Sequence, residues 1–251
     1  MGTLFRAGAQ PPALASFVGA TRQAGGAAGS PTPLVDASGL GFRYPTSLGA
    51  DDPDGAATPA SPALDPAPVL QGLDLRVAHG ERILLEGPSG GGKSTLAALL
   101  TGLRQPGAGL LLLQGLDRHT LGEGWHRLAA EAPQFHENHV LTGTLAFNLL
   151  MGRRWPAGPV ELDEAQALCE ELGLGELIAR MPGGLAQRIG ETGWQLSHGE
   201  RSRLFLARAL LQQAPLTVLD ESFAALDPAT LQRCLDAALR RSATLVVIAH
   251  P

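Results

Sequence analysis

Gly87-Pro88-Ser89-Gly90-Gly91-Gly92-Lys93-Ser94-Thr95 is the stretch of sequence that decides the fold of this chain. It fits the pattern G-x-x-x-x-G-K-[ST], in which a glycine-rich loop joins a strand to a helix and its N–H groups surround phosphate oxygens. The apolar run 83–86 predicts the strand, and a helix is predicted from 93 to about 103. The N-terminus of that helix adds a partial positive charge. The predicted phosphate site consists of Gly87, Ser89, Gly90, Gly91, Gly92, Lys93, Ser94 and Thr95.

Two of these side chains have predicted roles toward a nucleoside triphosphate. Lys93 should reach the β- and γ-phosphates, and the Ser94 hydroxyl should ligate Mg²⁺. The loop alone does not indicate which function the chain has, because kinases, GTPases, motors and transport ATPases share it. Other parts of the sequence are needed to distinguish these classes.

A second strand ends in two carboxylates. Residues 216–221 read Leu-Thr-Val-Leu-Asp-Glu, an apolar run that finishes at Asp220 and Glu221. Asp220 is predicted to hold Mg²⁺, and Glu221 to orient and deprotonate the attacking water, since in-line attack on the γ-phosphate needs a positioned nucleophile. The pair therefore favours hydrolysis.

Strand and helix patterns alternate along most of the chain. Strands are predicted at 34–44, 70–77, 83–86, 110–114, 216–220 and 244–249, and helices at 93–103, 142–151, 161–172, 175–180, 197–212 and 228–240. Such alternation is typical of an α/β fold with a mainly parallel sheet covered on both faces. Residues 134–200 are mostly helical and are predicted to form a subdomain.

Length and composition restrict the class of protein. The chain has 251 residues and a net charge of −5, which suits one large domain and argues against a general nucleic-acid-binding protein with a basic stripe. Cys169 and Cys234 imply no disulfide framework and fit a reducing compartment. No apolar run reaches the roughly 18 residues of a membrane span, and the N-terminus lacks the apolar core of a signal peptide.

Two segments have the composition of linkers. Residues 1–33, rich in Gly, Ala and Pro, are predicted to be a flexible N-terminal segment in which 14–21 is a candidate helix. Residues 46–68, rich in Ala, Asp, Pro and Ser, are predicted to be a flexible insertion in a domain that runs from 34 to 251.

The segment Leu196-Ser197-His198-Gly199-Glu200 carries a resemblance to a known family. It resembles the signature motif of the ATP-binding cassette (ABC) ATPase domains of transporters, and the resemblance runs from about residue 34 to the end. It implies a phosphate-loop NTPase (RecA-like) core, an antiparallel β subdomain and a helical subdomain. It also implies that two ATPase domains sandwich two ATP molecules head to tail, with Ser197 and Gly199 facing the ATP of the opposite subunit. His198 stands where glycine is usual, and its side chain would either crowd that nucleotide or add a hydrogen bond.

Four further residues acquire roles from the resemblance. Tyr44 is similar to the aromatic residue that stacks on adenine, and Gln134 to the glutamine that touches Mg²⁺ and reports to the membrane domain. The segment Ala225-Leu226-Asp227 is similar to the loop that couples the two ATP sites, and Asp227 is the residue of it assigned to the ATP site. His250 resembles the histidine that contacts the γ-phosphate and acts with Glu221 and Lys93 in catalysis.

The resemblance also suggests a subtype. Residues 143–148 and 190–193 are similar to exporter segments, so a transmembrane domain, fused or separate, is an expected partner at the cytoplasmic face of the membrane. Residues 1–33 would then be the tail of a fusion or a flexible segment, and the end at Pro251, earlier than in family members, suggests truncation. The alternatives are a soluble ABC-type ATPase acting on nucleic acid or ribosomes, a degenerate regulatory half, and a phosphate-loop kinase.

Overall fold

The main sheet has the strand order β1-β4-β11-β10-β7. The computed structural model describes residues 19–23, 32–45, 67–134, 136 and 138–249. The strands of this sheet are β1 Gly19–Gln23, β4 Arg82–Glu86, β7 Ala129–Ala132, β10 Leu216–Asp220 and β11 Thr244–Ala249. All neighbouring pairs are parallel except β1 with β4, which is antiparallel. The three central strands are mostly apolar because both faces of the sheet are covered.

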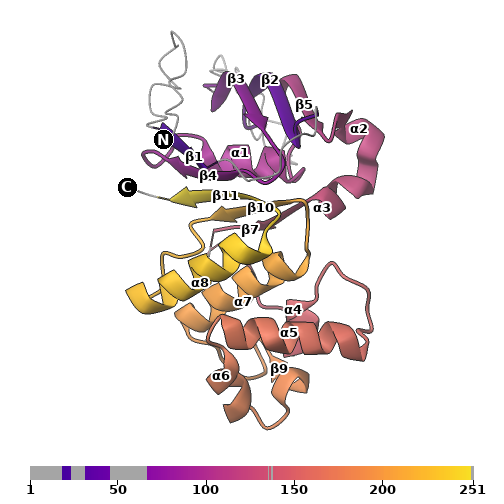
Figure 1. Cartoon of the computed structure of the whole chain (residues 1–251), viewed down its shortest axis with the longest axis vertical. Helices are drawn as coiled ribbons and strands as arrows, with labels where there is room; N and C mark the ends of the chain where they lie inside the picture. The colour runs from indigo at the N-terminus through magenta and orange to yellow at the C-terminus, as the bar shows by residue number, and fades with distance from the viewer. Residues whose placement is uncertain (1–18, 24–31, 46–66, 135, 137, 250–251) are drawn as a thin grey trace, which may run out of the picture.

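An antiparallel sheet covers one side of the main sheet (Figure 1). Its order is β3-β2-β5-β6, with β2 Val35–Phe42, β3 Leu70–Val77, β5 Ala108–Leu113 and β6 Leu116–Asp117. Helix α1, Lys93–Leu100, lies between the two sheets. Leu96 and Leu99 of α1 share one buried cluster with residues of both sheets, such as Leu40 and Val218, so this packing fixes where the N-terminus of α1 points.

Helices cover the other side of the main sheet. Helix α7, His198–Leu211, and helix α8, Pro228–Arg241, lie against it, and α4 Leu145–Leu149, α5 Pro159–Glu171 and α6 Gly175–Arg180 lie beyond them (Figure 1). A buried cluster of residues from these helices joins the layer to Leu219 and Leu245 of the sheet. The connections contain α2 Arg118–Leu121, η1 Gly122–Gly124, α3 Trp125–Leu128, η2 Gly184–Ala186 and the two-stranded sheet β8 Gly143–Thr144 with β9 Arg188–Ile189.

Local sequence explains where the long helices begin. Proline occupies the first turn of α5 and of α8, where the missing N–H has no partner to lose. Asp227 caps α8 by accepting hydrogen bonds from the N–H groups of Ala229 and Thr230, both at 3.1 Å. The start of α8 is therefore encoded in the three residues 227–229.

The structure differs from the sequence-based expectations at several places. The candidate helix over 14–21 is wrong for residues 19–21, which belong to strand β1, so part of the segment expected to be flexible is an edge strand of the main sheet. Strand β7 was not predicted, because its sequence Ala-Ala-Glu-Ala has little strand propensity and pairing with β10 imposes the conformation. Within 134–200, residues 143–144 of the helix expected at 142–151 form strand β8 instead, which pairs with β9 at 188–189. No helix of the described ranges is both long and apolar enough to cross a membrane.

Candidate functional site

The glycine-rich loop 87–92 connects β4 to α1, as the sequence predicts. Gly90 and Gly92 adopt positive φ angles of 77° and 80°, which L side chains disfavour. A Cβ atom on Gly92 would also lie 2.9 Å from Cδ2 of Leu70. Backbone conformation and packing together require glycine at position 92, where α1 begins.

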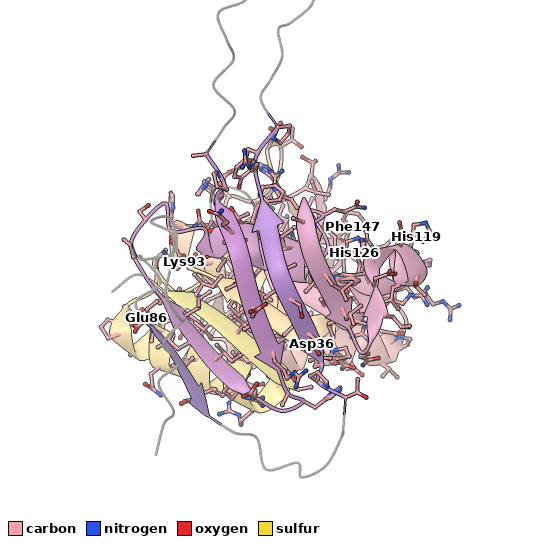
Figure 2. The ribbon with its side chains drawn as sticks, turned by 90° about the horizontal axis from the view of Figure 1, so that it is seen from above. Asp36, Glu86, Lys93, His119, His126 and Phe147 are labelled. Atoms are coloured by element: carbon pink, nitrogen blue, oxygen red, sulfur yellow. The ribbon has the colours of Figure 1, made fainter. Side chains whose placement is uncertain are left out.

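Lys93 turns back over the loop that precedes it. Its side chain is only 5% exposed, and its Nζ donates hydrogen bonds to the carbonyl oxygens of Gly87 at 2.8 Å and Pro88 at 2.9 Å. Seen from above in Figure 2, Lys93 lies on the other side of the antiparallel sheet from His119 of α2 and His126 of α3. The ammonium group is therefore held at the loop by neutral acceptors.

A cavity of about 260 Å³ opens in front of the loop. It is lined by Tyr44, Val69, Ser89, Gly90, Gly91, Gly92, Lys93, Ser94, Thr95, Gln134 and Glu221. Segments far apart in the sequence thus meet at one place, and most of the predicted ATP-site residues are among them. Val69, which is partly buried, was not predicted to belong to this site, because a valine before a strand carries no chemical signal.

Two of the three predicted Mg²⁺ ligands, Ser94 and Gln134, line this cavity, and the third, Asp220, directly precedes the lining residue Glu221. Gln134 follows β7, and its Nε2 donates to Oγ of Ser94 at 3.0 Å. Asp220 ends β10 and is 1% exposed. A hydroxyl and a carboxylate are the hard oxygen donors that Mg²⁺ prefers, and its sites commonly leave the other positions to waters and substrate phosphates. The donor set therefore fits Mg²⁺.

Glu221 adopts a left-handed backbone conformation, with φ of 50°. Its N–H donates to the carbonyl of Ile248 in β11 at 3.1 Å, and the next residue, Ser222, donates from Oγ to the carbonyl of Ala132 at 3.2 Å. A non-glycine residue with positive φ costs about 1–3 kcal/mol and persists only where the surroundings impose it. These two hydrogen bonds hold the end of β10 to β11 on one side and to β7 on the other, and Glu221 lines the cavity in this position.

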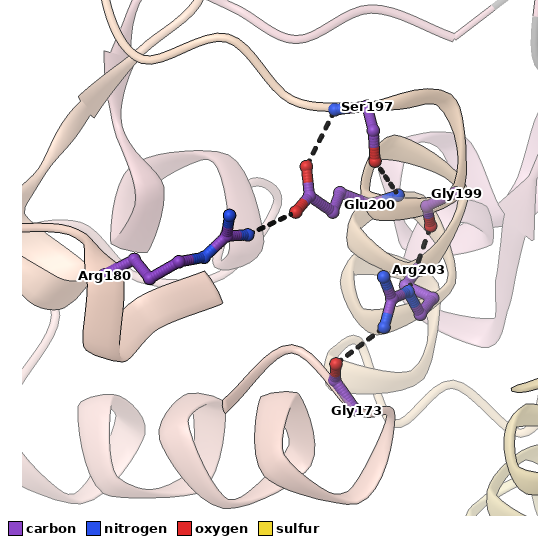
Figure 3. Close-up of polar contacts among 6 residues, drawn as sticks. All are labelled: Gly173, Arg180, Ser197, Gly199, Glu200 and Arg203. Carbon is purple, nitrogen blue, oxygen red and sulfur yellow. Dashed lines mark hydrogen bonds and ion pairs between the residues drawn. The ribbon is translucent and has the colours of Figure 1, made fainter. Parts of the chain in front are cut away.

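The signature segment forms the N-terminus of α7 (Figure 3). Ser197 and Glu200 make a capping box: Ser197 Oγ accepts from the Glu200 N–H at 3.2 Å, and the Ser197 N–H donates to Glu200 Oε2 at 2.7 Å. Arg180 of α6 pairs with Glu200 at 2.9 Å. Burial disfavours ionisation of Glu200, but the bonds from Ser197 and the charge of Arg180 outweigh it and lower the pKa of Glu200. A negative charge is thus fixed at the first turn of α7.

Arg203 of α7 connects the first turn of its own helix to the segment after α5. Its guanidinium donates to the Gly199 carbonyl at 3.1 Å and to the Gly173 carbonyl at 2.6 Å (Figure 3). A Cβ atom on Gly199 would lie 3.6 Å from the carbonyl oxygen of Ala225, so the signature helix is next to the loop that leads to Asp227.

The structure does not bring every predicted residue to the cavity. Five predicted residues are absent from the described residues that line it: Gly87, Ser197, Gly199, Asp220 and Asp227. Asp227 caps α8 instead, and its pKa is lowered by hydrogen bonds, first those from Thr230. His250 lies outside the described residues.

A groove of about 340 Å³ lies on the helical side of the molecule and was not predicted as a site. It is lined by His136, Asn138, His139, Val140, Gly190, Glu191, Trp194, Gln195, Leu196, Arg201 and Phe205. Gln195 holds one wall in place, because its Nε2 donates to the carbonyls of Gly190 at 2.8 Å and Glu191 at 3.3 Å. The groove therefore joins the segment after Gln134 to the segment 190–196.

A family model described as "ABC transporter" matches residues 70–224, which is more than half of the chain. The chain belongs to the ABC transporter family. The match spans the phosphate loop, the signature segment and the strand ending in Asp220, which are the features that carried the resemblance in the sequence. It confirms the phosphate-loop NTPase fold with a mainly parallel sheet, an antiparallel sheet and helices.

The relatives of this ABC domain are ATP-binding proteins of transporters. The chain is 40% identical over 184 residues to the mycobactin import ATP-binding/permease protein IrtB of Mycolicibacterium thermoresistibile, covering 72% of this chain and 31% of that protein. It is 40% identical over 196 residues to the ATP-dependent lipid A-core flippase of Chromobacterium violaceum, covering 76% and 32%. The chain spans about a third of the length of these relatives.

A solved structure has the same architecture. It is a bacterial Atm1-family ABC exporter with ATP bound, with a TM-score of 0.70 and 29% identity, covering 88% of this chain and 35% of that one. The ABC domain described here is thus similar to the ATP-binding part of a membrane transporter, and the alternative of an ATPase acting on nucleic acid or ribosomes is not favoured.

Proposed function

We propose that this ABC domain is a Mg²⁺-dependent ATPase that hydrolyses ATP to ADP and phosphate. The observation that supports it most is the meeting of Lys93, the Ser94–Gln134 pair and Glu221 at one cavity. In this proposal Lys93 and the N–H groups of the loop bind the β- and γ-phosphates, and Tyr44 stacks on adenine. Ser94, Gln134 and Asp220 would hold Mg²⁺, which would neutralise phosphate charge.

Glu221 is the proposed general base. A water oxygen attacks the γ-phosphorus in line, its proton goes to the Glu221 carboxylate, and the bond to the β–γ bridging oxygen breaks with its electron pair on ADP. His250 is proposed to contact the γ-phosphate.

Glu221→Gln tests this proposal in the purified chain. The amide keeps the shape of the side chain but takes up no proton, so we expect ATP affinity to stay within about threefold of wild type while turnover falls by about 10²–10⁴. We also expect ATP-loaded dimer to accumulate, as measured by light scattering after gel filtration. Wild-type turnover in this variant would remove Glu221 as the base.

A second ABC domain is the proposed partner. Within one chain, Ser197, Gly199 and Asp227 do not line the cavity that holds Lys93. A head-to-tail dimer would give them a role, because the N-terminus of α7 would then face the γ-phosphate bound by the opposite subunit.

We further propose that the domain powers export across a membrane through a transmembrane partner. The relatives are ATP-binding/permease proteins and a flippase, and the structural neighbour is an exporter. The groove lined by His136, residues 138–140 and residues of 190–205 contains the exporter-like residues 190–191 and is the proposed docking site. Fractionation of the cells of origin tests it: the protein should sediment with membranes, and a wholly soluble protein would contradict a membrane partner.

A further inference from the structure

Tyr44 is one member of a cluster formed by two aromatic rings and an arginine. The Phe42 ring meets the Tyr44 ring edge to face, with centroids 5.1 Å apart and an interplanar angle of 88°. The guanidinium carbon of Arg104 lies over the Tyr44 ring, 4.7 Å from its centroid, and 5.8 Å from the centroid of Phe42. A cation within about 6 Å of a ring centroid is attracted by the negative face of the ring.

The rest of the Tyr44 side chain contacts the phosphate-binding region. Its hydroxyl is hydrogen-bonded to Oγ1 of Thr95 at 3.0 Å, and its side chain lines the cavity in front of the loop. Arg104 is not among the described residues that line this cavity. Tyr44 therefore lies between the guanidinium and the place proposed for the nucleotide.

The backbone holds Arg104 in position beside the ring. Helix α1 ends at Leu100 with Thr101 as its C-cap, Gly102 follows with φ of 75°, and the Arg104 N–H donates to the carbonyl of Ala98 at 2.9 Å. A Cβ atom on residue 102 would lie 2.5 Å from Cδ1 of Trp125, so this turn is closely packed.

The two segments are also joined to one another. The N–H of Gly107, three residues beyond Arg104, donates to the carbonyl of Gly41 at 2.8 Å, and Gly41 directly precedes Phe42. The chain segments that contain Arg104 and Tyr44 are thus hydrogen-bonded to one another through their backbones.

We propose that Arg104 is a positioning residue for the adenine base, acting through Tyr44. The guanidinium on one face of Tyr44 fixes the orientation of the ring and draws electron density from it. The opposite face then stacks more strongly on an electron-rich purine. This inference rests on the proposed adenine-stacking role of Tyr44. Under this proposal, residue 104 affects the binding of the adenine base but not the binding of the phosphates.

The test compares two ligands that differ in the base. Isothermal titration calorimetry measures the Kd of MgATP and of magnesium tripolyphosphate for wild type, Arg104→Met and Arg104→Lys. We expect Arg104→Met to weaken MgATP binding by about two- to fivefold, because the Tyr44 ring loses its fixed orientation and the pull of the cation, an effect of the size of one exposed cation–π contact. Tripolyphosphate binding should change by less than half as much, and Arg104→Lys, which keeps the charge but not the planar group, should lie between wild type and Arg104→Met.

Two controls separate this effect from lost charge and from lost structure. Arg76→Met removes an equally charged exposed side chain from strand β3 of the same sheet and should leave both Kd values unchanged. Thermal unfolding of each variant checks the fold, and Arg104→Gln replaces Arg104→Met if that variant is unfolded. An equal weakening of both ligands, or unchanged MgATP affinity, would overturn the proposal.

Tyr44→Ala distinguishes failure of this inference from failure of the role proposed for Tyr44. If Tyr44→Ala weakens MgATP but not tripolyphosphate while the Arg104 variants do neither, Arg104 has no positioning role and the stacking role stands. If Tyr44→Ala also leaves the ratio of the two Kd values unchanged, adenine does not stack on Tyr44 and both proposals fall.

Discussion

Lys93 is the only lysine of the 251-residue chain. All other formal positive charges on side chains are arginines, which are better suited to flat, two-pronged contacts than to a point charge inside a narrow loop. The ammonium already bonds two carbonyl groups of the loop, so phosphate oxygens would replace these neutral acceptors with charged ones. A change at this residue should therefore act on nucleotide binding directly.

Lys93→Ala should reduce ATP affinity by at least about tenfold. A hydrogen bond between charged groups contributes about 1.5–3 kcal/mol, and 1.4 kcal/mol corresponds to a factor of ten in Kd. Equilibrium binding of a fluorescent ATP analogue measures this, with Arg127→Ala on α3 as a control that also removes one positive charge. Equal affinities in Lys93→Ala and wild type would show that the loop does not bind the triphosphate through this side chain.

At the scale of elements, helix α7 combines a structural and a proposed functional role at one residue. Ser197 caps the helix through its Oγ, and the same oxygen is the donor proposed to face the ATP of a partner subunit. The two roles are separable because alanine and glycine both remove the oxygen but differ as N-cap residues.

Ser197→Ala should lower the free energy of unfolding by about 0.5–2 kcal/mol, whereas Ser197→Gly should lower it by only a few tenths. Urea denaturation measures both. If Ser197 also contacts nucleotide, the two variants should lose ATPase activity to the same extent. Wild-type activity in the stable glycine variant would mean that Ser197 only caps the helix.

At the scale of the whole molecule, hydrogen bonds and ion pairs of arginines connect the helices of the helical layer. Arg208 of α7 donates to the carbonyl of Asn148 at 2.8 Å and to Oδ1 of Asn138 at 2.9 Å, and burial lowers its pKa to about 10. Glu171 at the end of α5 pairs with Arg240 at 2.7 Å and Arg241 at 2.6 Å at the end of α8. The first contact reaches the segment that lines the groove, and the second joins two helices distant in sequence.

The pair of contacts at Glu171 predicts a pH dependence of stability. Burial disfavours ionisation of Glu171, but the bonds and charges of Arg240 and Arg241 outweigh it and lower the pKa of the carboxyl. A lowered pKa in the folded state contributes stability that is present above the unfolded value of about 4.3 and is lost as the pH falls through the folded value.

Glu171→Gln should therefore be less stable than wild type at pH 7, and the difference should shrink as the pH falls below about 4. Urea unfolding at pH 7 and at pH 3.5 measures the change. Glu123→Gln, which removes an exposed carboxylate from η1, is the control and should follow wild type at both values. A difference that is constant with pH would show that the charge of Glu171 does not stabilise the fold.

Some of the site was predictable from sequence and some was not, for reasons that individual residues illustrate. The loop at Gly92 and the strand end at Asp220 were predictable because each depends on neighbours in the chain. Arg104 was not singled out, because an arginine after a helix is ordinarily a solvated residue, and nothing in the sequence places it beside Tyr44. Strand β7 was missed because pairing with β10, not local propensity, makes Ala129–Ala132 extended.

The sequence by itself determined the phosphate loop, the paired carboxylates and the capped signature helix, since glycine conformations, strand patterns and caps are set within a few residues. Tertiary structure decided which of these share a cavity. Gln134 reaches Ser94 across 40 residues, and Glu221 joins them because β4, β11, β10 and β7 lie side by side with their carboxyl ends together. Only that packing separates Ser197 and Asp227 from the same cavity and brings Arg104 to the face of Tyr44.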